Sequence, residues 1–266
     1  MYLWKAWHDS RARIMLYILA TSSLGVMYGL FVMSAANWHT CRDYFLNSDF
    51  YAEITFITLR WVFGYGLTTR PFNVLEWGFI SLGPTAILVA SLSLGASSVG
   101  REYDAGTMNF VLTRPSPRAS LVLTDWTVGL TAMVIIASGL VFPLLPFLCL
   151  VQAKGPGNIL AGLPALWVLG GAIYGLAHFA TLVAGSASKG LVLSVAMVLT
   201  YFFLPNALHE WWHIDALLKA VDWTLRPLDY DAWPLSPFDW SVTAFWLAVA
   251  AGFLGASLAW IRWREV

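Results

Sequence analysis

Residues 165–187 read ALWVLGGAIYGLAHFATLVAGSA and contain no Asp, Glu, Lys or Arg. These 23 residues exceed the roughly 20 apolar residues with which an α-helix crosses the hydrocarbon layer of a bilayer. The apolar residues are continuous rather than alternating with polar ones, which excludes a strand of a membrane β-barrel. The stretch therefore predicts a transmembrane helix.

Five further stretches lack all four charged residue types, and with the first they hold 132 of the 266 residues. They are 14–36, 77–98, 126–150, 190–207 and 241–261. The shortest of them, 190–207, still crosses the hydrocarbon layer if it stands with little tilt. We therefore predict an all-α membrane protein, a single domain over 1–266 with six transmembrane helices.

The composition of the whole chain agrees with this prediction. Hydrophobic residues make up 59% and charged residues 11%, whereas a soluble globular domain carries about 25% charged residues. The mean hydropathy is +0.68. These values exclude a disordered chain, a disulfide-rich small protein and an ordinary water-soluble enzyme. Fifteen Lys and Arg balance fifteen Asp and Glu, so the basic excess of a nucleic-acid-binding protein is missing.

The connections between the predicted spans differ in charge, and this difference sets their orientation. One set holds nine Lys and Arg in 47 residues, and the other holds six in 87. The first set comprises 1–13, 99–125, 188–189 and 262–266. Since cytoplasmic loops carry an excess of Lys and Arg, we predict a multi-pass protein of the cell (inner or plasma) membrane with both termini in the cytoplasm.

The N-terminal residues and the outer connections carry further expectations. Residues 1–13 fit a short helix on the inner membrane surface or a frayed tail with Trp anchors. The first span is too long for the apolar core of a cleaved signal peptide, which has 7–15 residues. In the connection 37–76, the apolar segment 54–66 is too short to span and predicts a surface or re-entrant element.

The connection 208–240 holds five of the fifteen Trp residues. Because Trp favours the headgroup level, we expect re-entrant or interfacial helices here, before the last span. The two cysteines, Cys41 and Cys149, are both expected at the outer ends of their helices. A disulfide between them and two unpaired thiols both remain open, because sequence does not place their Cα atoms within bonding range.

The predicted spans carry little of the chemistry of an active site. They contain no Asp, Glu, Lys or Arg, and His178 is their only histidine. A metal or bis-histidine haem site needs more than one ligand, so we interpret His178 as a packing residue and predict no catalytic, metal or cofactor site. No G-x-x-x-x-G-K-[ST] phosphate-binding loop is present, and 185–189 reads as a tight turn. Energy must come from a partner or a gradient.

The only sizeable inner connection, 99–125, contains one structured segment. Two prolines, Pro115 and Pro117, stop any helix that ends near residue 113. We predict a short helix over 101–113, with Glu102 and Asp104 in its first turn, where acids favour the helix dipole.

This segment resembles that of a known family. The run Arg101-Glu102-x-x-x-Gly106-Thr107-Met108-x-x-x-Leu112-Thr113-Arg114-Pro115-x-x-Arg118 is similar to the coupling-helix segment of ABC-2-type permeases, the transmembrane subunits of type V ABC exporters. The N-terminal Trp4-Lys5, the six-span layout and the basic tail from Arg262 also resemble the family, whereas the Trp-rich region before the last span departs from it.

The resemblance implies a function and partners. Two such permeases, identical or different, pair in the membrane, and each seats its coupling helix in a groove of a separate cytoplasmic ABC ATPase, which binds the ATP. The chain would then export a substrate, for which the uncharged spans favour a hydrophobic or amphipathic molecule. The residues expected to act in coupling are Arg101, Glu102, Asp104, Gly106, Thr107, Arg114 and Arg118.

Two other classes of protein share single features with the chain. The sequence Glu210-Trp211-Trp212-His213 is reminiscent of a haem-handling membrane protein with a Trp-rich outer loop, although the longer motif of such proteins is not reproduced. His209 and His213, which share one face if the segment is helical, together with Asp215 are the only cluster that would serve a membrane-embedded lipid enzyme. No nucleophile motif accompanies them.

Overall fold

The structure is a computed structural model that describes residues 2–36, 73–108, 118–146, 156–212, 216, 219–221 and 240–263. Within these ranges it is helical and contains no strand, as the sequence predicts. The helices are α1 (Tyr2–Ala36), α4 (Asn73–Asp104), α6 (Arg118–Val141), α8 (Pro156–Ala184), α9 (Ala187–Trp212) and α11 (Trp240–Trp263).

Four segments of the described helices are long and apolar enough to cross a membrane. They are Ala119–Val141, Leu166–Ala184, Ala187–Pro205 and Trp240–Trp263. Their length and composition identify a multi-pass membrane protein and correspond to the last four predicted spans. The first two predicted spans, 14–36 and 77–98, fall within the long helices α1 and α4.

The predicted third span, 126–150, is displaced along the chain. Helix α6 begins eight residues earlier, at Arg118, and ends at Val141, where a turn over 142–144 follows. The cause of the early end is Pro143, which has no N–H to donate and disfavours a helical residue before it. The start was misplaced because the spans were predicted as stretches without charged residues, so that the third began after Asp125. A charged residue does not, however, interrupt a helix.

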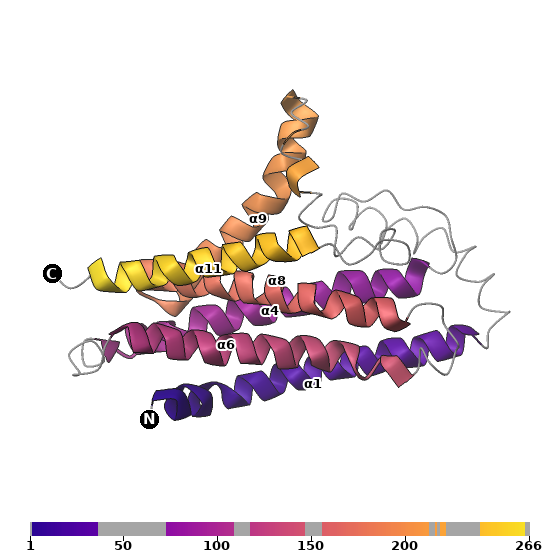
Figure 1. The fold of residues 1–266 in the computed structure, drawn as a ribbon, viewed down its shortest axis with the longest axis horizontal. Helices are drawn as coiled ribbons and strands as arrows, with labels where there is room; N and C mark the ends of the chain where they lie inside the picture. The colour runs from indigo at the N-terminus through magenta and orange to yellow at the C-terminus, as the bar shows by residue number, and fades with distance from the viewer. Residues whose placement is uncertain are drawn as a thin grey trace.

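Helices α1, α4, α6, α8 and α11 run roughly along one direction in a bundle, and α9 leaves it at an angle (Figure 1). Helix α8 is central, because it packs against α4, α6, α9 and α11. The two termini lie at the same end of the bundle (Figure 1), which agrees with the prediction that both are on one side of the membrane.

Glycines let α8 and α6 approach each other closely. A Cβ at Gly175 would overlap the ring of Trp126, and one at Gly171 would lie 2.7 Å from Cδ2 of Leu130. From sequence, this small-residue pair is as compatible with a dimer contact as with an intramolecular one. In the structure it forms an intramolecular contact.

His178 lies in the interior beside this contact. It is fully buried, and its ring centroid is 6.2 Å from that of Trp126 and 6.1 Å from that of Tyr174. The hydroxyl of Ser257 lies 3.4 Å from its Nδ1, while no described residue forms a hydrogen bond with Nε2. Among the described residues, no group of three or more His, Cys, Asp and Glu could hold a metal ion. These contacts agree with the packing role expected for His178.

The tight turn expected over 185–189 is shorter than predicted. It consists of Gly185 and Ser186, since α9 already begins at Ala187. Gly185 has a φ of 66° and donates its N–H to the carbonyl of Thr181 at 2.9 Å, which closes the end of α8 with a left-handed residue.

The N-terminal residues do not form a separate surface helix or a frayed tail, which corrects both interpretations. Helix α1 is continuous over 35 residues, a length of about 52 Å at roughly 1.5 Å per residue. Ala6 and Trp7 pack against the core of the bundle. The first 24 residues contain neither Gly nor Pro, so nothing interrupts the helix where its charges begin. Helix α1 is therefore longer than the roughly 30 Å hydrocarbon layer.

Some sequence predictions fall outside the described residues. These are the segment 54–66, Cys41, Cys149 and most of the connection 208–240. The first residues of that connection belong to α9, which runs to Trp212.

Candidate functional site

The predicted coupling segment has a different local structure from the expected one. Residues 101–104 form the last turn of α4 rather than the first turn of a separate helix over 101–113. Glu102 and Asp104 therefore stand at a helix C-terminus, where the dipole disfavours acids. The predicted start of the helix was wrong because it was placed at the first charge, although nothing before Arg101 stops α4. Met108 is helical, and 109–117 lie outside the described residues.

Gly106 and Thr107 end α4 with a left-handed cap. Gly106 has a φ of 68°; its N–H donates to the carbonyl of Tyr103, and the N–H of Thr107 donates to the carbonyl of Glu102, both at 3.0 Å. This pair of bonds defines a Schellman motif, which favours glycine at the left-handed position. Among the described residues, no atom would lie within 4 Å of a Cβ at Gly106. The positive φ is therefore the requirement for glycine that the described structure shows.

The carboxylate of Glu102 is held by two donors. Lys5 Nζ on α1 lies 2.7 Å from its Oε1, and the hydroxyl of Thr107 donates to its Oε2 at 2.5 Å. Partial burial raises the pKa of Glu102, but the bonds from Lys5 and Thr107 outweigh it and leave this pKa below its usual range. These donors stabilise a charge that the end of α4 alone would disfavour.

Arg101 joins the end of α4 to α1 through neutral acceptors. Its Nη1 donates to the backbone carbonyl of Asp9 at 2.8 Å, and its Nη2 lies 3.4 Å from the hydroxyl of Ser10. Its Nε donates to the carbonyl of Ser97 within α4 at 3.1 Å. Burial, and then the positive charge of Arg101, lowers the pKa of Arg13. The contacts of Arg101 and Glu102 together fasten two antiparallel helices at one end.

Asp104 extends the same junction to a third helix. Its Oδ1 accepts a hydrogen bond of 3.4 Å from the backbone N–H of Ala187, the first residue of α9, where an acid favours the helix dipole. A Cβ at Gly100 would lie 2.5 Å from the Cβ of Ala187, so these helices approach closely. The end of α4 is therefore in contact with both α1 and α9.

The structure brings most of the predicted coupling residues to this one helix end. Arg101, Glu102, Asp104, Gly106 and Thr107 lie within it. Arg118 is the first residue of α6, but its side chain is not among those described, and Arg114 lies outside the described residues.

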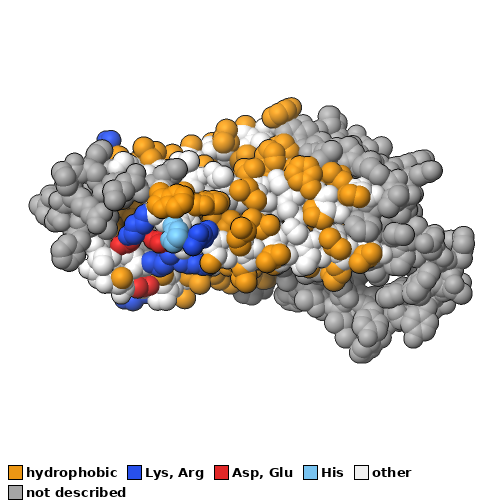
Figure 2. Space-filling model, turned by 90° about the horizontal axis from the view of Figure 1, so that it is seen from below, with side chains coloured by type: hydrophobic (Ala, Val, Ile, Leu, Met, Phe, Trp, Pro, Cys, Tyr) orange, Lys and Arg blue, Asp and Glu red, His pale blue; other side chains and the backbone are white. Residues whose placement is uncertain are grey.

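On the face that Figure 2 shows, charged side chains gather at this end of the molecule, and orange hydrophobic side chains are spread over the rest of the described part of that face. Trp4 is 71% exposed beside His8, with ring centroids 6.1 Å apart. Sequence reasoning missed the α1 partners Lys5, Asp9 and Ser10. A single sequence gives no signal for them, since they lie more than 90 residues from their partners on α4.

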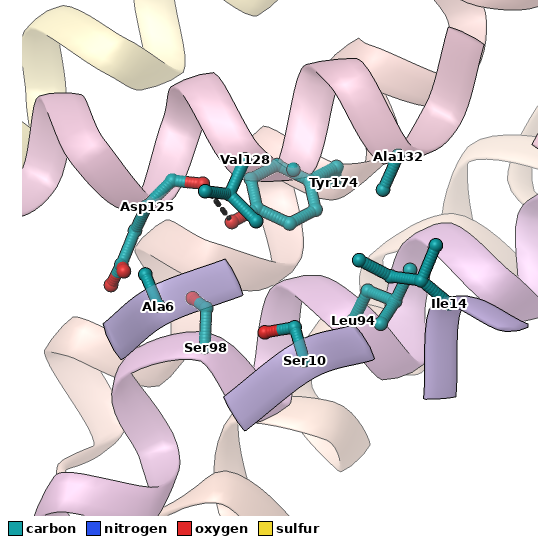
Figure 3. Close-up of a pocket in the computed structure, with 10 residues that line it drawn as sticks. Ala6, Ser10, Ile14, Leu94, Ser98, Asp125, Val128, Ala132 and Tyr174 are labelled. Atoms are coloured by element: carbon teal, nitrogen blue, oxygen red, sulfur yellow. Dashed lines mark hydrogen bonds between the residues drawn. The ribbon is translucent and has the colours of Figure 1, made fainter. Parts of the chain in front are cut away.

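A narrow pocket lies between α1, α4, α6 and α8 beside this junction. Ser10, Ser98, Asp125 and Tyr174 contribute its polar groups. The hydroxyl of Tyr174 donates to the backbone carbonyl of Asp125 at 2.9 Å (Figure 3). The Asp125 side chain is directed toward the end of the pocket that holds Ala6, away from Ala132 (Figure 3). The sequence prediction did not include Asp125 among the functional residues, because it placed this charged residue in the connection 99–125.

The residues of the alternative interpretations have no described side chains. His209 lies in α9 without a described side chain, and His213 and Asp215 lie outside the described residues.

No protein-family model matches the chain. Searches of curated proteins and of solved structures also find no match. The resemblance to exporter permeases therefore rests on the residues of the chain alone.

Proposed function

We propose that the chain is the permease subunit of an ATP-driven ABC exporter of the ABC-2 type. In this proposal six helices span the membrane, α1 and α4 included, and a second permease copy, identical or different, completes the pathway. Both termini lie in the cytoplasm. A separate cytoplasmic ABC ATPase binds the charged end of the bundle and supplies the energy.

The observation that carries the proposal is the end of α4. The residues that resemble the coupling segment, Arg101 to Thr107, form a capped helix end whose turn, 104–107, is exposed. A partner that grips this turn would hold a rigid element, because both bonds of the cap fix its backbone.

The contacts of this end suit the transmission of force. The Lys5–Glu102 pair and the bonds from Arg101 link it to α1, and Asp104 links it to α9. A displacement of the end of α4 therefore acts on three helices at once. Packed elements of this kind move as bodies between discrete arrangements.

The energy source and the cargo follow from what the sequence offers. The chain has no phosphate-binding loop of the Walker type, so the ATP would be held by the partner, and the chain is not itself an enzyme in this proposal. Spans without Lys, Arg, Asp or Glu in their lipid-crossing parts favour a hydrophobic or amphipathic substrate over a charged one.

The proposal is tested with a candidate ABC ATPase, to be sought first among the genes that neighbour the gene of this chain. The purified permease should not hydrolyse ATP alone, should retain the ATPase in a pull-down, and should stimulate its turnover in proteoliposomes. Glu102→Ala should remove most of this stimulation while expression and membrane insertion are unchanged. Asp9→Asn, at an exposed residue whose backbone carbonyl accepts the bond from Arg101, is the matched control and should behave like the parent.

A second variant separates coupling from simple stability. Lys5→Ala breaks the same 2.7 Å pair but leaves the Glu102 carboxylate free for a partner. An exposed pair is worth at most about 1 kcal/mol, so Lys5→Ala should lose much less stimulation than Glu102→Ala. Equal losses for the two variants would assign Glu102 to the junction with α1 alone. An ATPase that neither binds nor responds to the parent would refute the proposed function.

A further inference from the structure

Asp125 is a charged residue that has no role in the function proposed above. It is the eighth residue of α6 and is half-buried. It lines the pocket together with Ser10 and Ser98, near the inner membrane boundary that the distribution of charged residues predicts. Among the described residues, no hydrogen bond or ion pair reaches its carboxylate. A partly buried carboxylate without a partner is unfavourable, because it loses bonds to water and gains no other bond in exchange.

A cation that is bonded elsewhere adjoins the same pocket, because Nη2 of Arg101 lies 3.4 Å from the hydroxyl of Ser10, which lines the pocket together with Asp125. Arg101 acts electrostatically on Asp125, and Lys5 does so more weakly, while Glu102 opposes both. Lys5 is already paired with Glu102. The guanidinium of Arg101, in contrast, donates to a backbone carbonyl and a hydroxyl of α1, which are neutral acceptors. A carboxylate bonds a guanidinium more strongly than such acceptors do.

The Asp125 carboxylate has no partner among the described residues, and the Arg101 guanidinium bonds neutral acceptors. A bond between these two groups would be stronger than the bonds that Arg101 makes in this structure. Arg101 is on α4, Asp125 is on α6, and the pocket of Ser10, Ser98 and Tyr174 lies between α1, α4 and α6 (Figure 3). Ser10, Ser98 and Asp125 form a small polar group within the lining, which is otherwise mostly apolar. A shift of the end of α4 toward α6 would bring the guanidinium from Ser10 toward the Asp125 carboxylate.

We propose that Asp125 is the alternative partner of Arg101, and that Arg101 passes from the α1 backbone to the Asp125 carboxylate when the ATPase moves the end of α4. This inference deepens the proposed function and rests on it. Asp125 is a positioning residue that favours the moved state, and Arg101 is the group that changes partners. The charged groups that face this exchange are Lys5, Glu102 and Arg13.

The first test is a double-mutant cycle on ATPase stimulation in proteoliposomes. Asp125→Asn should lower the stimulated turnover by about fivefold, at the low end of couplings between sites, and Asp125→Glu should restore most of it. In an Arg101→Gln background, Asp125→Asn should cause no further loss. Asp9→Asn is the matched control, because it removes an exposed carboxylate beside Arg101 and keeps the bonded carbonyl.

The second test measures the movement directly and does not depend on removing either partner. Spin labels are placed at Ala105 and at Leu123, which is 46% exposed, after both native cysteines are replaced. The distance between the labels should shorten when the complex is trapped with ATP, and this change should be absent in the Asp125→Asn variant. A residue needed only for packing would alter thermal stability without abolishing an ATP-dependent change.

The outcomes distinguish this inference from the proposed function. If the parent binds and stimulates the ATPase but the label distance stays constant or lengthens, the partner exchange is wrong and the permease function stands. The same follows if Asp125→Asn behaves like Asp9→Asn, or keeps its full effect in the Arg101→Gln background. If the ATPase does not bind the parent, both proposals are overturned.

Discussion

Glu102 is an acid at the C-terminus of a helix, where the helix dipole disfavours its charge and two neighbouring donors stabilise it. It stands at the C-terminal end of α4, and Lys5 and Thr107 hold its carboxylate. Its lowered pKa sets the sign of the pH dependence. The pair contributes fully above the usual pKa of Glu, about 4.3, and its contribution is lost as the pH falls through the lowered folded-state value.

We therefore expect the start of α1 to detach from α4 only in acid. The protection factors of the amides of residues 2–13, which correct for the intrinsic pH dependence of exchange, should fall below about pH 4 and stay constant between pH 6 and 8. The Glu102→Gln variant, which cannot ionise, should show the lower protection factors at every pH. The effect is small, at most about 1 kcal/mol, because the pair is partly exposed. An acid-induced fall of the same size in Glu102→Gln would show that another group is responsible.

At the scale of elements, close approach of α6 and α8 depends on glycine. A Cβ at Gly175 would overlap Trp126, whereas one at Gly252 on α11 would meet nothing within 4 Å. Gly175→Ala should therefore destabilise the protein by about 1–3 kcal/mol, as overpacking does. The matched Gly252→Ala should be neutral or stabilising, because alanine favours a helix. Thermal unfolding in detergent compares the two, and equal midpoints would contradict the packing described.

The helices themselves could largely be predicted from sequence, because charge-free apolar runs of membrane length have few alternatives. Their ends could not. Charges at Arg101 and Asp125 suggest loops, yet α4 and α6 continue through both, since the end of a membrane is not the end of a helix. The coupling residues could be recognised from their sequence motif, but their partners on α1 could not, because Lys5 and Glu102 are 97 residues apart.

At the scale of the whole molecule, the shared location of the termini (Figure 1) and the Lys and Arg distribution predict one orientation. In a background without Cys41 and Cys149, a membrane-impermeant thiol reagent added outside should label a cysteine placed at Asp229 and should miss one at Asp104. The positive-inside tendency is the physical reason. The reverse labelling pattern would place the charged end of α4 outside the cell and exclude any contact with a cytoplasmic ATPase.

The central claim is that an ABC ATPase grips the end of α4, and site-specific photo-crosslinking tests it most directly. A photoreactive amino acid is introduced at Ala105, in the exposed turn after α4, and, as a control, at Leu247, which is 59% exposed on α11. In membranes that contain both subunits, illumination should join the ATPase to position 105 and not to position 247. A complex that forms and stays active but shows no cross-link from position 105, or equal cross-linking from both positions, would contradict the account.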